Sequence, residues 1–401
     1  MQPGALAGIK VLELGTLIAG PFCSRLLAEF GADVVKIESP DGGDPIRQWR
    51  TLHHGTSLWW YVQSRNKKSV TLNMKDARAQ AIARTLALDA DIVIENYRPG
   101  VLEKWGLGYD QLKKEKPSLI MVRLSGYGQT GPMRDRPGFG AIAESMGGIR
   151  FVSGHTDRPP VRIGISIGDS LAALHGALGA LTALHHRDQT GGRGQGQGQM
   201  VDVALYEAVF NMMESMVPEY DLYKVVRERT GGALPGIVPS NTYPCSDGRS
   251  IVIAGNGDAI FKRLMNVIGR PDLANDPGLV RNDGRVPRVE EIDEAITCWT
   301  RAHSIDEVLA SLTVADVPSG KIYSVADMRV DPQFLARQMF EAHKFSDGEV
   351  VTLPGIVPKL SETPGQTHWI GPALGEHTDE VLGTLGYSEE ERARLKAEGV
   401  T

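Results

Sequence analysis

Strand-like and helix-like segments alternate along the first 125 residues, and this alternation constrains the fold more than any other feature. Short runs rich in Val, Ile and Leu predict strands, and the amphipathic runs between them predict helices. The predicted strands cover residues 9–15, 32–38, 69–73, 91–96 and 119–124, and the predicted helices cover 22–30, 77–90 and 101–115. Strands that alternate with helices form βαβ units. We therefore predict an α/β fold with a mostly parallel sheet.

The pattern changes near residue 225. Residues 240–244 and 250–254 have the composition of a hairpin joined by an Asp-Gly turn, and amphipathic helices follow. We predict a large domain over residues 1–225 and a smaller α+β domain over 226–330. A C-terminal segment, 331–401, is expected to pack back on the large domain.

The composition is that of an ordinary globular protein. Of the 401 residues, 41% are hydrophobic and 23% are charged, and the net charge of −6 gives no general attraction to nucleic acid or anionic membranes. The three cysteines are widely separated, as expected in a reducing compartment. The first residues lack the features of a signal peptide, and the apolar stretch 171–184 is too short to span a bilayer. We expect a soluble cytoplasmic protein with no nucleic-acid or membrane partner.

The predicted strands end in loops rich in Gly, Pro or Asn, where α/β sheets bind their ligands. These loops are Gly15–Pro21, Glu38–Asp44, Asn96–Gly100 and Ser125–Pro132. The first has the glycine spacing of a Walker A loop, but Pro21-Phe22 replaces the Lys-Ser/Thr that nucleotide hydrolysis requires. The dinucleotide fingerprint G-x-G-x-x-G is also missing from this turn, which argues against NAD.

The sequence contains no H-E-x-x-H and no paired C-x-x-C metal motif. His53-His54 and His185-His186 are adjacent pairs, and neighbours point apart on a helix or strand, so we predict surface or packing histidines and no metal. Several cations precede residue 105 and form either a solvated face or a pocket for a phosphorylated or carboxylate ligand. They are Arg47, Arg65, Lys67, Lys68, Lys75, Arg98 and Lys104.

Asp169 is the candidate reactive residue. It lies in Gly168-Asp169-Ser170, directly before an apolar run that extends to Leu181, and thus at or near a helix N-terminus. Backbone N–H groups and the helix dipole favour a charged carboxylate there, so an ordinary N-cap is one interpretation. Gly168 offers the other, because a glycine lets a second molecule approach the backbone closely.

Taken in order, several stretches resemble the class III CoA-transferase family, which includes formyl-CoA transferase. The resemblance spans nearly the whole chain. It rests on residues 8–14 with Ala19-Gly20-Pro21, on 30–38, 43–47, 66–69 and 95–100, on 126–132, on Gly168-Asp169-Ser170, and on 201–208. It implies a Rossmann-like large domain and an interlocked homodimer, to which the returning C-terminal segment is suited.

The resemblance also implies a chemistry. Asp169 is the nucleophile that carries CoA as an aspartyl thioester, so CoA thioesters are substrates and no cofactor is permanently bound. The family's CoA contacts fall on Ile18, Ala19, Leu72, Lys75, Asn96, Tyr97, Arg98 and Lys104. A glycine-rich loop that helps to close the site matches Gly255-Asn256-Gly257-Asp258, with Asn256 and Asp258 in place of glycines of formyl-CoA transferase.

Two departures bear on specificity. Ser39 stands where formyl-CoA transferase has a CoA-binding arginine, and Lys36, Lys75 or Arg98 could compensate for its loss. Phe139-Gly140 stands where that enzyme has a tyrosine–glutamate pair. The chain looks most like enzymes that use succinyl-CoA with a C5 dicarboxylate (itaconate, mesaconate or citramalate), and itaconate CoA-transferase is the nearest match. We expect an arginine to bind the free carboxylate of such an acceptor, and we assign Arg47.

Two alternatives remain open. An acyl-CoA racemase of the same superfamily needs a base on each face of the α-carbon, yet residues 134–153 contain no histidine at the matching place. A non-catalytic CoA-binding protein would keep the first loops and would not need Asp169.

Overall fold

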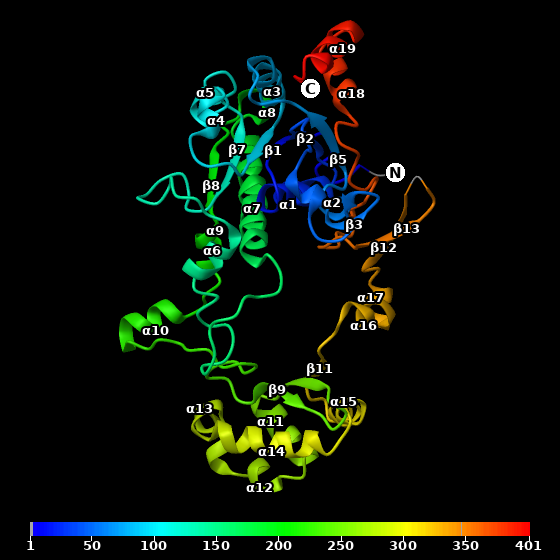
Figure 1. Ribbon diagram of the computed structural model, residues 1–401. Coiled ribbons are helices and arrows are strands. Elements are labelled where there is room, and N and C mark those ends of the chain that lie inside the picture. The colour runs from blue at the N-terminus through cyan, green and yellow to red at the C-terminus, as the bar shows by residue number, and fades with distance from the viewer. Residues whose placement is uncertain (1–2, 346) are drawn as a thin grey trace. The chain divides into compact units, whose positions relative to one another are not determined.

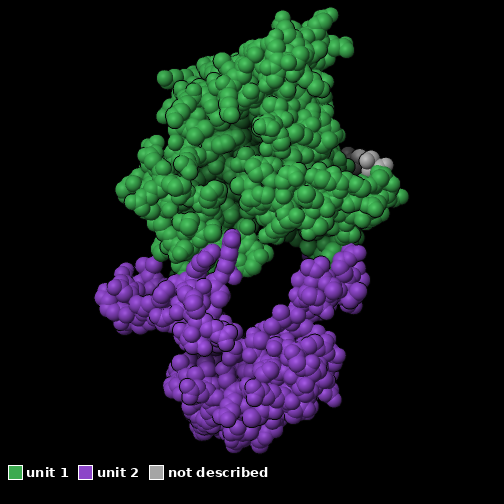
Figure 2. Space-filling model, viewed as in Figure 1, with its two compact units in different colours: residues 1–149, 163–214, 338–401 green, residues 150–162, 215–337 purple. Residues whose placement is uncertain are grey.

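The computed structural model describes residues 3–345 and 347–401, which form two compact units (Figures 1 and 2). Unit 1 comprises residues 1–149, 163–214 and 338–401, and unit 2 comprises 150–162 and 215–337. We placed the domain boundaries at 225 and 330. The chain instead changes unit at 214/215 and 337/338, and it also enters unit 2 briefly at 150–162.

Unit 1 contains a six-stranded sheet in which every neighbouring pair is parallel, which confirms the predicted parallel sheet. Its strands are β1 (Lys10–Leu14), β2 (Asp33–Glu38), β5 (Lys67–Thr71), β6 (Ile92–Glu95), β7 (Ile120–Ser125) and β8 (Met200–Ala204). The spatial order β5-β2-β1-β6-β7-β8 is 3-2-1-4-5-6 when these strands are numbered along the chain. The order reverses between β1 and β6, and ligands of such sheets bind beyond the strand ends at this point.

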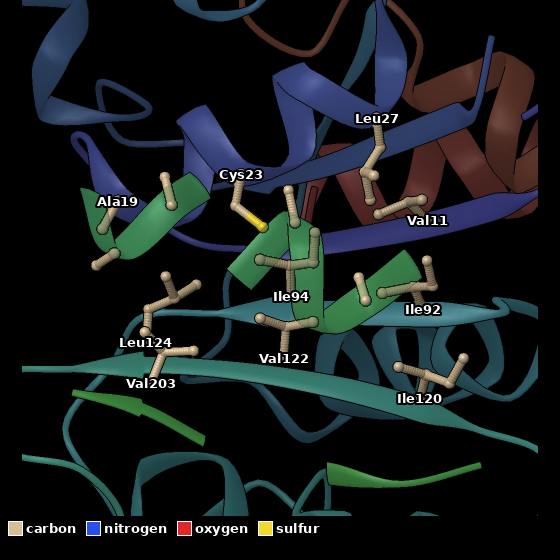
Figure 3. Close-up of a cluster of buried hydrophobic side chains, with 14 of the residues drawn as sticks. Val11, Ala19, Cys23, Leu27, Ile92, Ile94, Ile120, Val122, Leu124 and Val203 are labelled. Carbon is tan, nitrogen blue, oxygen red and sulfur yellow. The ribbon is translucent and has the colours of Figure 1, made fainter. Parts of the chain in front are cut away.

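Alternate residues of the strands enter two different hydrophobic cores, as the two-residue period of a strand requires. Val11, Ile92 and Val122 face a core that includes helices α1 and α7 (Figure 3), whereas Leu12 and Val93 face a second core that includes α3, α5, α18 and α19. Helices therefore cover both faces of the sheet. The helices of unit 1 are α1 (Ala19–Ala28), α2 (Leu58–Gln63), α3 (Ala77–Asp89), α4 (Val101–Lys104), α5 (Tyr109–Lys113), α6 (Gly140–Met146), α7 (Ile167–Gln189), α8 (Gly192–Gln195), α9 (Leu205–Phe210), α18 (Thr378–Thr384) and α19 (Glu389–Ala397), with a 3-10 helix η1 (Pro45–Gln48).

The C-terminal segment 338–401 belongs to unit 1. The Gln366 N–H donates to Glu29 O at 2.9 Å, and the Asn73 N–H donates to Val400 O at 2.8 Å. Two hairpins complete the unit, β3 (Leu52–His53) with β4 (Thr56–Ser57), and β12 (Phe340–Lys344) with β13 (Val350–Pro354).

Unit 2 has its own core around a three-stranded antiparallel sheet in the order β11-β10-β9. The predicted hairpin is present as β9 (Ser240–Pro244) and β10 (Ser250–Ala254), and β11 (Ser319–Lys321) joins it. The helices are α10 (Met216–Tyr223), α11 (Asp258–Val267), α12 (Pro271–Ala274), α13 (Asn282–Arg285), α14 (Val289–Arg301), α15 (Ile305–Val314), α16 (Val325–Val330) and α17 (Pro332–Ala336), with 3-10 helices η2 (Pro277–Leu279) and η3 (Val286–Arg288).

Two helix predictions need correction. The helix expected over 101–115 is divided into α4 and α5, because Gly106 has a left-handed φ of 72°. The apolar stretch 171–184 belongs to the 23-residue α7, which among the described residues is the one helix long and apolar enough to cross a membrane. Its small residues, such as Ala173, Gly176 and Ala180, are buried in unit 1, so we interpret α7 as a core helix.

Candidate active site

The loops that follow β1 and β6 meet at the point where the strand order reverses. The Asn96 side chain accepts a hydrogen bond from the Thr16 N–H and donates one to Thr16 O, each at 2.8 Å. A Cβ on Gly15 or Gly20 would lie 3.0 or 3.2 Å from this amide, so both glycines make room for it. The Asn96 amide therefore fixes the shape of the first loop, which explains its glycine pattern.

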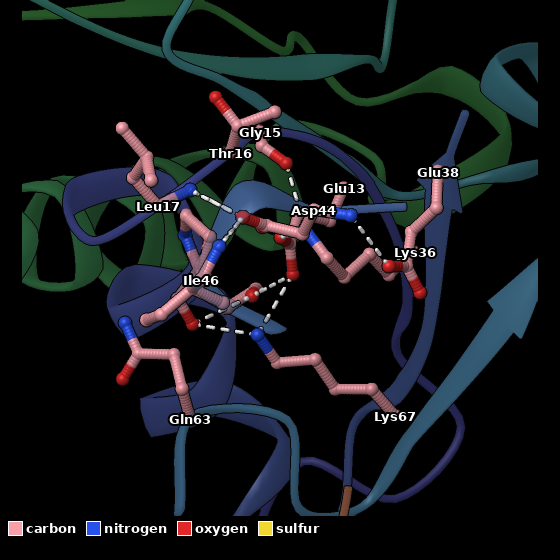
Figure 4. A network of polar contacts seen from close by, with 12 residues as sticks. Glu13, Gly15, Thr16, Leu17, Lys36, Glu38, Asp44, Ile46, Gln63 and Lys67 are labelled. Atoms are coloured by element: carbon pink, nitrogen blue, oxygen red, sulfur yellow. Dashed lines mark hydrogen bonds and ion pairs between the residues drawn. The ribbon is translucent and has the colours of Figure 1, made fainter. Parts of the chain in front are cut away.

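A buried network of charged side chains lies beneath this loop (Figure 4). Lys36 Nζ contacts Glu13 at 2.6 Å and Asp44 at 2.9 Å, and Lys67 Nζ contacts Glu13 at 2.8 Å. Asp44 in turn accepts two hydrogen bonds from the N–H of Leu17, whose φ is 65°. Burial alone would raise the pKa of Glu13, but the two ammonium groups bring it down to about 2. The network thus holds the loop in a conformation that a leucine rarely adopts.

A cavity of about 210 Å³ opens at the carboxyl ends of β1, β2, β5 and β6. Of the predicted CoA contacts, Leu72, Lys75 and Tyr97 line it, together with Ser39 and Trp105. The Tyr97 and Trp105 rings meet edge to face at 5.3 Å. Such a pair offers an aromatic wall against which a planar base can pack. The other predicted contacts, Ile18, Ala19, Asn96, Arg98 and Lys104, are not among the residues that line this cavity.

The predicted cation cluster divides into two groups. Arg47, Arg65, Lys67 and Lys68 are committed to carboxylates inside unit 1. Lys75, Arg98 and Lys104 are exposed, and no ion pair is found for them within the described residues. Lys36 cannot compensate for Ser39, because it is buried in the Glu13–Asp44 network. Lys75 is the cation that lies on the cavity wall beside Ser39.

Arg47 does not have the role that we assigned to it. Its Nε and Nη2 each donate to the Glu38 carboxylate at 2.8 Å, and its Nη1 donates to Pro372 O at 3.2 Å. Its Cζ also lies 3.5 Å from the centre of the Trp60 ring, and the residue is only 6% exposed. The guanidinium is therefore already paired with a carboxylate, and it is not available for the free end of a dicarboxylate substrate.

Asp169 is the third residue of α7, so it lies in the first turn of the helix and is not the N-cap, which is Ser166. Its carboxylate packs against Gly140, the first residue of α6: a Cβ built on Gly140 would overlap Asp169 Oδ2 and would lie 2.7 Å from Asp169 Cγ. A Cβ on Gly168 would lie 3.1 Å from Gly140 O. The space beside Gly168, which we expected a second molecule to approach, is thus occupied by the start of α6.

A second pair of glycines positions the start of α6 beside Asp169. A Cβ on Gly126, just after β7, would lie 2.8 Å from the Cα of Gly138, and a Cβ on Gly138 would lie 2.9 Å from the Cα of Gly126. The two backbones therefore cross in direct contact, which only glycine permits. This crossing sets the chain before α6 against the carboxyl end of β7 and so positions Gly140 against Asp169.

The loop Gly255–Asp258 belongs to unit 2. Gly257 is the N-cap of α11, and a Cβ on Gly255 would press against the Leu264 side chain. The buried Arg285 donates to Asn256 O at 2.9 Å and to the Asp258 carboxylate at 2.6 Å. The Asp258 side chain thus has a structural role that a glycine could not fill, since its carboxylate holds the Arg285 guanidinium under the loop.

Most of the sequence matches a family model. The match to CoA-transferase family III covers residues 6–378. The succinyl-CoA–D-citramalate CoA-transferase of Chloroflexus aurantiacus is 48% identical over 400 residues, which are 99% of this chain and 98% of the relative. This chain belongs to the family III CoA-transferases.

Further comparisons agree with this CoA-transferase assignment. The beta subunit of the succinyl-CoA–L-malate CoA-transferase of Chloroflexus aurantiacus is 42% identical over 400 residues, 98% of each chain. The crystal structure of a CAIB/BAIF family protein from Brucella suis has a TM-score of 0.83 and 32% identity, covering 96% of this chain and 100% of that one. The predicted family and the α/β fold are both confirmed.

Sequence reasoning missed three parts of the candidate site. Trp105 is a loop aromatic ten residues beyond β6 and carries no local signal. The Lys36 network had a signal, because a charge inside a strand that is covered on both faces must find a buried partner. Gly140 also had a signal in the sequence, because the resemblance placed it where formyl-CoA transferase has a glutamate.

Proposed function

We propose that the chain transfers CoA from succinyl-CoA to a dicarboxylate through covalent catalysis by Asp169. The observation that carries this proposal is the position of Asp169, in the first turn of α7 and packed against Gly140, in a chain of this family. The related enzymes named for CoA transfer favour this reaction over racemisation and over simple binding.

The reaction needs four bond exchanges. An Asp169 oxygen attacks the thioester carbonyl and expels the CoA thiolate, leaving an aspartyl–succinyl anhydride. The thiolate attacks the aspartyl carbonyl, which releases succinate and forms an aspartyl-CoA thioester. The acceptor carboxylate then attacks this thioester, and the released thiolate attacks the acceptor carbonyl of the new anhydride. The acceptor leaves as its CoA ester, Asp169 is again a carboxylate, and no net proton is consumed.

CoA binding is proposed at the loops around the cavity. Lys75 and the Tyr97–Trp105 wall line it, and Leu72 contributes apolar surface. Ile18, Ala19, Asn96, Arg98 and Lys104 stay proposed contacts on the adjoining loops. Exposed Lys75, Arg98 and Lys104 supply the positive charge that CoA phosphates need. Gly255, Asn256 and Gly257 of the unit 2 loop stay proposed substrate contacts, on the resemblance to the family.

We propose citramalate ahead of itaconate as acceptor, because the relative named for D-citramalate is 48% identical and the one named for L-malate is 42% identical. Succinyl-CoA should be consumed with citramalate and with malate, and more slowly with itaconate, mesaconate and glutarate. Formation of each CoA ester is measured by chromatography and mass spectrometry, with oxalate as the negative control. If none of these acceptors supports the consumption of succinyl-CoA, the proposal is contradicted.

We also propose a soluble, cytoplasmic, interlocked homodimer. Residues 163–214 and 338–401 of unit 1 flank residues 215–337 of unit 2 in the sequence, an order that is compatible with the interlocking that the resemblance implies. On α7, Leu174, Leu178 and Leu181 form an apolar stripe on one helix face, with exposures of 49%, 63% and 43%, and a second subunit would cover it.

Light scattering should therefore give twice the chain mass of 43.5 kDa. Tagged and untagged dimers, when mixed, should not exchange subunits unless they are first unfolded, because interlocked rings cannot separate. A monomer mass would contradict the dimer, and rapid exchange would contradict the interlocking.

A further inference from the structure

His53 and His54 lie together in the β3–β4 hairpin of unit 1, and neither lines the cavity. Their hairpin has a two-residue turn, His54-Gly55, with φ values of 48° and 77°. This turn brings the two imidazole rings to the same side, with centroids 4.1 Å apart. The prediction that adjacent histidines point apart is therefore wrong at this pair.

Two carboxylates from the turn of the β12–β13 hairpin face these rings, and Figure 1 shows β3 beside that hairpin. His54 Nε2 lies 2.7 Å from Asp347 Oδ2 and 3.7 Å from Glu349 Oε2, and His53 Nε2 lies 3.3 Å from Glu349 Oε2. One nitrogen or oxygen from each of the four residues lies within 4.8 Å of the other three.

Neighbouring groups hold His53 and Asp347 in place. Phe345 stacks on the His53 ring at 4.4 Å and is itself in edge contact with Tyr61 at 4.9 Å. The Glu349 N–H donates to Asp347 Oδ1 at 2.9 Å, which leaves Oδ2 directed at His54. His53 Nε2 is buried and makes no hydrogen bond within the described residues. A buried nitrogen beside a carboxylate and without a hydrogen bond is poorly satisfied as it stands.

We propose that His53, His54, Asp347 and Glu349 bind one divalent metal ion of the zinc class. Tetrahedral zinc has bonds of about 2.0–2.2 Å to nitrogen and oxygen, so its ligand atoms lie roughly 3.3–3.6 Å apart. The three observed separations of 2.7, 3.3 and 3.7 Å bracket this range. Two carboxylates neutralise the ion, and two imidazoles select zinc, cobalt or nickel over magnesium and calcium.

The bound ion would connect the β3–β4 hairpin to the C-terminal segment. The four ligands come from residues 53–54 and 347–349, which are far apart in the sequence, and none lines the CoA cavity. A metal that joins such segments stabilises the folded state, because the unfolded chain does not hold the site together. The proposal is thus a structural site, separate from the transfer chemistry.

The test uses the full-length protein without a histidine tag, stripped with EDTA and then titrated with Co²⁺. The wild type should bind one equivalent with the visible absorption of tetrahedral cobalt, Zn²⁺ should displace it, and Mg²⁺ should not. Zn²⁺ should also raise the unfolding temperature. His54→Asn, which tolerates the positive φ, and Asp347→Asn should each weaken binding by about tenfold or more.

The matched control is His186→Asn, because His185-His186 is the other adjacent pair and lies on α7. This variant should bind Co²⁺ as the wild type does. Circular dichroism checks that each variant is folded. Absence of stoichiometric cobalt absorption in the wild type, or equal affinity in His54→Asn and the wild type, would overturn the site and leave only an ion pair between the two hairpins.

Discussion

Replacement of Asp169 by asparagine is expected to lower the rate of CoA transfer by about 10⁴-fold or more, the scale of loss when a covalent nucleophile is removed. Asparagine keeps the shape of the side chain that packs against Gly140, so the fold should be unchanged. It has no carboxylate oxygen to attack the thioester, and therefore neither anhydride nor aspartyl-CoA can form. Initial rates with succinyl-CoA and citramalate measure the effect.

Chemical trapping of the covalent intermediate should identify the same residue. When wild-type protein is incubated with succinyl-CoA and treated with hydroxylamine or borohydride, mass spectrometry should find Asp169 modified. Asp169→Asn should show no modification there. Asp188→Asn changes another acid of α7, an exposed one beside Arg187, and should transfer and trap like the wild type. A variant at Asp169 that retains wild-type activity would refute the nucleophile.

The parallel sheet was predictable because its signals are local. Strands β1, β2, β6 and β7 are short, mainly apolar runs, and the turns at their carboxyl ends contain glycine or proline. Their parallel direction then follows from connection rules. The β3–β4 hairpin has only two residues in each strand, and its register depends on the turn conformation of His54-Gly55. Such a short element has no hydrophobic period to detect, so the sequence could not show that it brings two histidines together.

The error at Arg47 has a different cause. The sequence shows a cation after a strand end, where ligands bind, but it does not show that Glu38 points to the same place and accepts two hydrogen bonds from it. Partners nine residues apart across a loop leave no periodic signal. Lys36 was misjudged for the same reason, because its partners Glu13 and Asp44 come from other segments. Packing decides which cations are available to a ligand, and of the seven cations in the predicted cluster Lys75, Arg98 and Lys104 are exposed.

Gly140→Ala should abolish most activity without unfolding the protein. The φ of Gly140 is not left-handed, and alanine is the better helix former at this first position of α6 by roughly 1 kcal/mol, so the backbone tolerates the change. The added Cβ, however, overlaps the carboxylate of Asp169 and must turn it away or push α6 aside. Because a displacement of about 1 Å can cost about 10²-fold in rate, we expect a loss of this size in kcat, with KM for succinyl-CoA near the wild-type value.

Gly164→Ala is the matched control, since a Cβ at this position five residues before Asp169 meets no atom within 4 Å. It should leave kcat unchanged, and circular dichroism should show that both alanine variants are folded. If Gly140→Ala acts by displacing the carboxylate, adding it to Asp169→Asn should cause no further loss, because the group through which it acts is already gone. A multiplicative loss in the double variant would place the role of Gly140 elsewhere, for example in contact with substrate.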